Sequence, residues 1–471
     1  MKKSPFLIFN FPFLTRHPDP SLQASWHYAQ LGFLIFPLIP ILGAVGIFIG
    51  LVGTWRKKYP TIIRRPLNRG FAIFCAWVII SASFAPFPLE ALLGLFNFLP
   101  FFIFFAAYSE LIQTPAQLRR LAWILVVPSV AVVILGFGQI LLGWASPALL
   151  EGIVGWALQP KGNPIGRMAS VFMYANILAA YLQIMFILAL GLWIEESKKR
   201  SPQSPRLRTA TLEQRAEAKA KTKYIFPFPF TWRIGFLSVA VIGNAAALIL
   251  TNSRNAWAIV VLSCLAFAFY QGWRWLIAGV GAIATSILWA AFGPSPVREW
   301  LRTIVPYYFW ARLTDQMYPD RPVALLRTTQ WQFAWSMTQQ RPWTGWGLRN
   351  FTPLYEAQMK VWLGHPHSLL LMLTAETGIP ATIFFCGLVG WVMVQAALLL
   401  AEMRLISSPQ NRLILFSYLV AFGACTLFNV VDVSIFDLRV NTLGWLLLAA
   451  ICGAVYQKRA IATNFIEQSR S

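Results

Sequence analysis

The chain has 471 residues, of which 57% are hydrophobic and 12% charged, and its net charge is +22. Soluble globular domains contain about 25% charged residues, so this composition excludes an ordinary soluble protein and indicates one that lies in a membrane. Nucleic-acid binding is not indicated, because much of the positive charge lies in short loops beside apolar runs, where membrane topology requires it. These runs are long enough for helices to cross a ~30 Å hydrocarbon core, and they lack the short alternating pattern of barrel strands. We therefore predict an all-α, polytopic transmembrane helical bundle.

Eleven apolar stretches between polar residues are the predicted membrane helices. In chain order they are residues 31–54, 71–85, 89–109, 121–144, 169–194, 234–250, 256–270, 273–292, 377–401, 411–431 and 440–456. Residues 1–30 form a polar segment that does not resemble a cleavable signal peptide. Pro37, Pro40 and Gly43 offer a break in the first stretch, which would turn it into a re-entrant or two-part hairpin. The expected number is therefore eleven or twelve membrane helices.

Lysine and arginine collect in short loops, which places these loops on the cytoplasmic side. The strongest case is the basic interval 195–233, in which residues 211–223 have helical composition, and the C-terminal tail 457–471 is expected on the same side. The opposite, outer face then receives residues 86–88, 145–168, 251–255, 293–367 and 432–439. We thus expect a first bundle over 31–292, a long outer loop over 293–367 and C-terminal membrane helices over 368–456.

The outer loop 293–367 is too long for a bare connection, so we expect it to be partly helical and to form a lid or platform. Residues 322–340 and 350–363 have the composition of its two helices. Within the loop, Gly345 and Gly347 form a GxG pattern, but no preceding strand supports nucleotide binding, and a tight turn is the simpler interpretation. The five cysteines fall inside apolar runs and indicate packing rather than a disulfide or zinc site.

Two of the four histidines, His365 and His367, lie at the end of this loop. Histidine titrates near neutral pH and can accept a proton from an attacking hydroxyl group, so a general base is chemically reasonable here. A histidine at the start of a helix is, however, more often an interfacial hydrogen-bonding residue. Metal binding would need further ligands, and a His-x-His pair with no third histidine or cysteine nearby is weak evidence for it. We therefore predict no metal and no cofactor.

Three arginines, Arg167, Arg254 and Arg439, lie on the expected outer face beside apolar spans. Arginine near hydrocarbon is costly and usually has a partner, so each is a functional candidate. A planar guanidinium group binds phosphate oxygens in pairs, which suits a lipid-linked pyrophosphate. The alternative for Arg439 is a structural ion pair with Asp432 or Asp437. For Arg254, which has no acidic residue near it in the sequence, the functional interpretation is stronger.

Four stretches together resemble a known family. They are Arg167 with the Asn176-Ile-Leu-Ala segment, the Ser253-Arg254 pair, the turn over residues 342–351, and His367 with its downstream Glu376 and Gly378. They are similar to motifs of the O-antigen ligase and polymerase superfamily of bacterial membrane glycosyltransferases, over about residues 70–455. Ser368 stands where the family usually has asparagine, Ala175 where it has proline, and His365-Pro366 is an addition. The residues of these motifs are most similar to those of a cyanobacterial subgroup that has been described as bicarbonate transporters.

The resemblance implies a multi-pass protein of the bacterial inner membrane that works at the periplasmic face. The donor would be a glycan on undecaprenyl pyrophosphate and the acceptor a hydroxyl group of a glycan or lipid, with no metal. His367 would be the base, while Arg167 and Arg254 would bind and stabilise the pyrophosphate. Further substrate-binding candidates are His365, Arg349, Arg439 and Glu376. The alternatives are a bicarbonate or inorganic carbon transporter, or an accessory protein of carbon accumulation.

Overall fold

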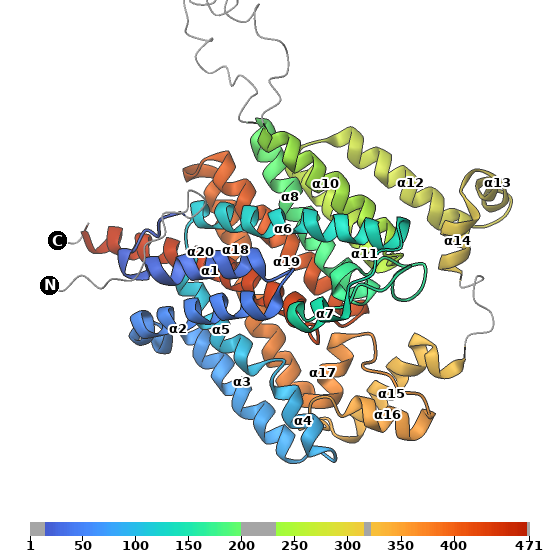
Figure 1. The fold of residues 1–471 in the computed structure, drawn as a ribbon, viewed down its shortest axis with the longest axis horizontal. Coiled ribbons are helices and arrows are strands. Elements are labelled where there is room, and N and C mark those ends of the chain that lie inside the picture. The colour runs from blue at the N-terminus through green and yellow to red at the C-terminus, as the bar shows by residue number, and fades with distance from the viewer. Residues whose placement is uncertain (1–14, 199–231, 315–321, 469–471) are drawn as a thin grey trace, which may run out of the picture.

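The computed structural model describes residues 15–198, 232–314 and 322–468, and all regular elements in these ranges are helices. The helix predicted over 211–223 lies outside the described residues. Nine of the described segments are long and apolar enough to cross a membrane. They are α3 (Pro66–Ser83), α4–α5 (Pro88–Leu95 and Leu99–Leu111), α6 (Pro115–Leu141), α8 (Ala175–Lys198), α10 (Trp232–Leu250), α12 (Arg274–Phe292), α18 (Ile379–Ile406), α19 (Pro409–Val431) and α20 (Leu438–Gln468). The predicted all-α membrane bundle is confirmed (Figure 1).

The nine segments are fewer than the eleven or twelve membrane helices expected from the sequence. Helices α2 (Pro40–Arg64) and α11 (Arg254–Gln271) cover the two remaining predicted stretches but are not among the nine. Their polar ends explain this difference: α2 ends in several basic residues, and α11 begins with Arg254 and Asn255. The most deeply buried membrane segments are those of α8 and α20, whereas α12 lies at the edge of the bundle and is largely exposed.

A two-part helical hairpin covers the first predicted stretch, but it begins earlier and ends later than predicted, over residues 23–64. Helix α1 (Gln23–Ile35) ends just before Pro37, and α2 begins at Pro40. The two helices approach closely at glycines: a Cβ atom on Gly32 would lie 2.6 Å from the backbone nitrogen of Ile47. The hairpin therefore brings the start of α1 and the end of α2 to the same end of the bundle.

One end of the bundle is rich in basic residues and is held by ion pairs between partly exposed arginines and buried glutamates. Arg65 pairs with Glu110 at 2.6 Å, and Arg119 pairs with Glu195 at 2.7 Å. These contacts join the end of α2 to the end of α5 and the start of α6 to the end of α8. His17, just before α1, contacts the Leu111 carbonyl oxygen at 3.0 Å, so the beginning of the described chain also lies at this basic end.

The five intervals assigned to the outer face meet at the opposite end of the bundle. The Phe87 N–H donates to the Asn350 side chain at 2.9 Å. The Arg167 side chain donates to the Thr251 carbonyl at 2.8 Å. Arg439 donates to the Val171 carbonyl, just after the interval 145–168, at 2.9 Å. These segments therefore lie at one end of the bundle, although they are far apart in the sequence.

The long loop is largely helical, as expected. It contains α13 (Val297–Ile304), α14 (Tyr307–Leu313), the 3-10 turn η3 (Val323–Leu325), α15 (Arg327–Gln340) and α16 (Phe351–Met359), and it leads into α17 (Leu369–Thr377). The two predicted helices correspond to α15 and α16, whereas α13 and α14 were not predicted. Helices α15–α17 lie together beside α4 (Figure 1), around a small core of Phe333, Met337, Phe351 and Tyr355.

Candidate active site

The turn after α15 fixes the helix that follows the two histidines. The Trp346 N–H donates to the Ala375 carbonyl at 3.0 Å, and the Gly347 N–H donates to the Glu376 carbonyl at 2.8 Å. Gly345 has φ +67°, and a Cβ atom there would lie 2.4 Å from the Glu376 carbonyl carbon. Only glycine fits this close approach, so the GxG pattern forms a tight turn that holds α17 in place.

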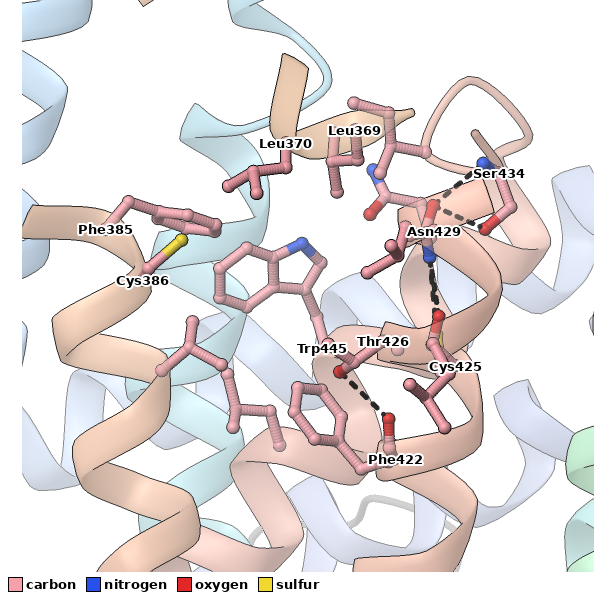
Figure 2. A pocket seen from close by; sticks show the side chains of 18 of the residues that line it. Leu369, Leu370, Phe385, Cys386, Phe422, Cys425, Thr426, Asn429, Ser434 and Trp445 are labelled. Carbon is pink, nitrogen blue, oxygen red and sulfur yellow. Dashed lines mark hydrogen bonds between the residues drawn. The ribbon is translucent and has the colours of Figure 1, made fainter. Parts of the chain in front are cut away.

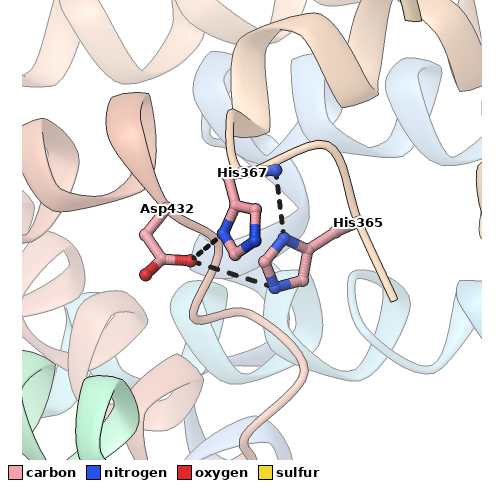
Figure 3. Close-up of side chains that lie close together, drawn as sticks. All are labelled: His365, His367 and Asp432. Atoms are coloured by element: carbon pink, nitrogen blue, oxygen red, sulfur yellow. Dashed lines mark hydrogen bonds and ion pairs between the residues drawn. The ribbon is translucent and has the colours of Figure 1, made fainter. Parts of the chain in front are cut away.

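His367 precedes α17 and contacts a carboxylate that is 65 residues away in the sequence. Its Nδ1 lies 2.9 Å from Oδ1 of Asp432, which directly follows α19 (Figure 3). His367 has φ +51°, an uncommon left-handed conformation for a residue other than glycine. The imidazole ring is partly exposed, with 23% of its side chain accessible. The base candidate thus lies between a buried anion and an accessible face.

Asp432 is buried, and its carboxylate is surrounded by hydrogen-bond donors. The Asn176 side-chain amide donates to Oδ2 at 2.8 Å, and the Val433 N–H donates to Oδ1 at 2.9 Å. Burial by itself raises the pKa of Asp432, but the hydrogen bond and charge of His367 and the charge of His365 outweigh it, and the pKa is lowered. The carboxylate is therefore ionised at neutral pH and can only accept hydrogen bonds.

This arrangement decides which nitrogen of His367 carries the proton. Because ionised Asp432 only accepts, Nδ1 of His367 must be the N–H that donates to it. In neutral imidazole the other nitrogen, Nε2, then carries a lone pair and can accept a proton. The same Asp–His relation orients the general base in serine hydrolases, where the carboxylate also stabilises the imidazolium ion that forms.

His365 contacts the same pair from the other side. Its Nδ1 accepts the His367 N–H at 3.1 Å, and its Nε2 lies 3.9 Å from Oδ1 of Asp432. Its ring stacks on Phe436 with 5.9 Å between centroids. Burial lowers the pKa of His365 to about 4, and the charges of His367 and Arg327 act in the same direction. His365 is therefore neutral at pH 7.

The two arginines expected to bind pyrophosphate reach this end of the bundle in different ways. Arg167 donates to the Asn176 side-chain oxygen at 2.5 Å and to the Thr251 carbonyl at 2.8 Å. A continuous chain of contacts therefore runs from Arg167 through Asn176 and Asp432 to His367. Arg254 is the first residue of α11, and its side chain is exposed.

The residue after Arg254 connects α11 to the same site. The Asn255 side chain donates to the Val431 carbonyl at 3.4 Å, one residue before Asp432. This contact places the start of α11, and with it Arg254, beside the end of α19.

The remaining candidates make other contacts. Arg439 is buried, pairs with Asp437 at 3.3 Å and lies over the Phe172 ring at 3.9 Å. This is the structural ion pair considered as its alternative. Arg349 pairs with Glu90 at 3.1 Å on a partly exposed surface.

Glu376 is a buried acid that forms no ion pair within the described residues, although the charge of Arg349 acts on it. One oxygen accepts the Phe351 N–H at 3.2 Å, and the other has no hydrogen-bond partner in the described part of the chain. Burial raises the pKa of Glu376 to about 8. The protonated form is therefore favoured at neutral pH, and the side chain connects α17 to the start of α16.

An apolar cavity of about 520 Å³ lies between α17, α18, α19 and α20. Leu369 and Leu370, which directly follow His367 and Ser368, form one side of it (Figure 2). Trp445 stands at its centre in this view, and Asn429 and Ser434 are hydrogen-bonded to one another at its edge. The cavity thus begins next to the segments that carry the two histidines and Asp432.

Sequence reasoning missed the partner of His367, the candidate base. Asp432 was considered only as a partner of Arg439, and Asn176 only as part of a motif. A weak signal existed, since Asp432 follows an apolar span directly and therefore lies at a membrane boundary. Arg327, whose charge acts on His365, was not singled out either. Distances of 65 and 256 residues along the chain separate Asp432 from His367 and Asn176.

Comparison with known families gives an independent finding. Residues 239–386 match the O-antigen ligase family. The matched segment contains Arg254, both histidines and Glu376, but it begins after Arg167 and ends before Asp432. No curated protein sequence matches the chain. Together with the membrane helices, this match supports a role in glycosyl transfer at a membrane. The match does not confirm the resemblance to the cyanobacterial subgroup.

Proposed function

We propose that this protein transfers a glycan from undecaprenyl pyrophosphate to an acceptor hydroxyl group at the periplasmic face of a bacterial inner membrane. The observation that carries this proposal is the His367–Asp432 pair, which leaves a lone pair on Nε2 of His367. A hydroxyl group needs a base at the moment of attack, and an imidazole held by an ionised carboxylate is well suited to that task. No cofactor takes part in the proposed reaction.

In the proposed reaction the acceptor oxygen attacks the anomeric carbon of the donor sugar. The bond between this carbon and the pyrophosphate oxygen breaks, the hydroxyl proton moves to Nε2 of His367, and undecaprenyl pyrophosphate leaves. Asp432 stabilises the imidazolium ion that forms. Arg167 and Arg254 stabilise the negative charge on the departing pyrophosphate, a task that preorganised cations perform well in a site poor in water.

The apolar cavity supports a lipid-linked donor. It is lined almost entirely by hydrophobic side chains from α17 to α20 and begins beside His367. A polyprenyl chain placed there would bring its pyrophosphate to the end of the bundle where Arg167 and Arg254 lie. A free sugar nucleotide would gain nothing from such a surface, because its polar groups would lose their contacts with water.

The distribution of charge supports the orientation. Asn176 lies at the site end of α8, and Glu195, which pairs with Arg119, lies at the basic end. At 1.5 Å per residue these positions are about 28 Å apart, close to the thickness of the hydrocarbon core. Because basic loops remain in the cytoplasm, the site would face the periplasm.

The test is glycan attachment in cells that carry His367→Gln. We expect the variant to insert at the normal level and to lose attachment of long glycans, because glutamine cannot accept the proton. The matched control is His27→Gln in α1, which changes a histidine at the basic end and should retain attachment. A normal glycan pattern in His367→Gln, or saturable bicarbonate flux in liposomes that is unaffected by this substitution, would contradict the proposal.

A further inference from the structure

Three potential metal ligands meet at the site. The ring nitrogens of His365 and His367 and a carboxylate oxygen of Asp432 all lie within 4.8 Å of one another (Figure 3). Two histidines alone were weak evidence for a metal, since the sequence shows no third ligand near them. The fold supplies the third ligand from the end of α19. This cluster is the one group of three such side chains in the described residues.

The distances between the ligand atoms suit a small divalent ion after modest side-chain movement. Nδ1 of His367 and Nε2 of His365 lie 2.9 Å and 3.9 Å from Oδ1 of Asp432. Around a tetrahedral ion with bonds of about 2.0–2.1 Å, neighbouring ligand atoms lie roughly 3.3 Å apart. The two observed distances fall on either side of that value. Two imidazoles and one carboxylate are a ligand set that zinc uses, whereas magnesium and calcium prefer oxygen ligands.

A neighbouring side chain also orients the carboxylate for binding. The Asn176 amide holds the second oxygen of Asp432 at 2.8 Å, and hydrogen bonds of this kind orient a ligating carboxylate. Oδ1 of Asp432 already faces both imidazole rings, so the carboxylate needs no large rotation to bind the metal ion.

We infer that His365, His367 and Asp432 form a binding site for Zn²⁺, and that zinc and the catalytic base exclude one another. Zinc on Nδ1 of His367 moves the proton of the neutral ring to Nε2, and Nε2 can then no longer accept a proton. At His365 the proton on Nε2 moves to Nδ1, which ends the hydrogen bond from the His367 N–H. No proton is released from either ring. The expected inhibition of glycan transfer by zinc rests on the proposed function, but the binding of zinc does not.

The binding test uses the full-length protein in detergent or nanodiscs and Zn²⁺ alone. We expect one tightly bound zinc per chain, removable by a chelator, with an X-ray absorption spectrum of nitrogen and oxygen ligands and no sulfur. His365→Gln should weaken zinc binding at least tenfold. The matched control, His27→Gln, should bind zinc as the unchanged protein does. The thermal unfolding midpoint should rise with zinc in the control but not in His365→Gln.

The inference is overturned if the unchanged protein binds no more zinc than the double variant His365→Gln and His367→Gln. It is also overturned if sulfur ligands appear in the spectrum, or if His27→Gln weakens binding as much as His365→Gln does. Transfer is measured separately. If zinc binds as expected but the zinc-free protein transfers no glycan, the metal site stands and the proposed function fails.

Discussion

Asp432 and Asp437 lie five residues apart on one segment, and they hold two different kinds of partner. Asp437 accepts the Arg439 side chain at 3.3 Å and the Arg439 and Val440 N–H groups at 2.9 and 3.0 Å. Arg439 also donates to the Val171 and Pro37 carbonyls, so its guanidinium group joins three segments. Asp432 holds His367, whose second nitrogen remains able to take a proton.

The difference shows how a reactive group is recognised beside a structural one. Both acids form a close contact with a basic side chain, and the residue types alone do not separate them. An arginine bound to an acid and two carbonyls serves to hold the fold together, because it cannot lose its proton. A histidine that donates to one acid through Nδ1 still has Nε2, which can accept a proton. We therefore distinguish the candidate site from the structural ion pair by this remaining nitrogen.

The largest expected effect comes from Asp432→Asn. Asparagine no longer requires Nδ1 of His367 to be the donor and does not stabilise the imidazolium ion, so transfer should fall by about 10²–10⁴-fold. The measurement is the rate of transfer per folded protein from a lipid-linked donor. The matched variant Asp437→Asn should stay within about threefold of the normal rate. Equal losses in both variants would remove the distinction between the two acids.

The next largest effect concerns stability. Arg439→Gln removes a buried ion pair and leaves Oδ2 of Asp437 and two carbonyls without the guanidinium donor, so we expect a loss of about 3–5 kcal/mol. The measurement is thermal or denaturant unfolding in detergent micelles. Asp432→Asn keeps the shape of the side chain and should lower the free energy of unfolding less than Arg439→Gln does. If Asp432→Asn destabilised the protein more than Arg439→Gln does, Asp432 would be the structural acid of the two.

Glu376 is a third acid, which is buried, and among the described residues it forms no ion pair, although the charge of Arg349 acts on it. Its raised pKa of about 8 means that the folded protein favours the protonated form. The resulting stabilisation is complete below the unfolded pKa of about 4.5 and is lost as the pH rises toward 8. Glu376→Gln should therefore raise stability at pH 8 by up to about 4 kcal/mol relative to the unchanged protein. Unfolding midpoints at pH 5 and pH 8 test this, and an unchanged pH dependence in the variant would contradict it.

The smallest effect belongs to an exposed pair. Arg349 and Glu90 are 3.1 Å apart, but their side chains are 39% and 37% accessible. Water and salt screen such pairs, so Arg349→Gln should change the free energy of unfolding by less than about 1 kcal/mol. The measurement is the free energy of unfolding of the unchanged protein and of Arg349→Gln in low and in high salt. The difference between these two proteins should be nearly the same in both conditions. If Arg349→Gln lowered the free energy of unfolding as much as Arg439→Gln does, the exposure of the two arginines would not explain their contributions to stability.

Much of the fold could be predicted because hydrophobicity and charge act locally along the chain. The break before Pro40, the basic end and the five outer intervals all follow from short stretches of sequence. The helices α13 and α14 were missed because both are short and their aromatic residues do not form a long apolar run.

The site was predicted only in part, for a physical reason. His367 and Arg167 are unusual in their own surroundings, so each could be identified from nearby residues. Asp432 gains its proposed role from contacts with His367, just before α17, and with Asn176 on α8, and the sequence does not place these segments side by side. Likewise, nothing local showed whether Arg439 would pair with Asp432 or Asp437. Pairing between distant segments is set by helix packing, which hydrophobic spans alone do not determine.

The most direct test of the proposed function is a double-mutant cycle on transfer. The rates of the unchanged protein, His367→Gln, Asp432→Asn and the double variant are compared per folded protein, with the same lipid-linked donor and acceptor. Residues that act as one unit have strongly non-additive effects. We therefore predict that the double variant is no slower than His367→Gln alone. If the two losses multiply, or if His367→Gln retains the full rate, the His367–Asp432 pair is not the base.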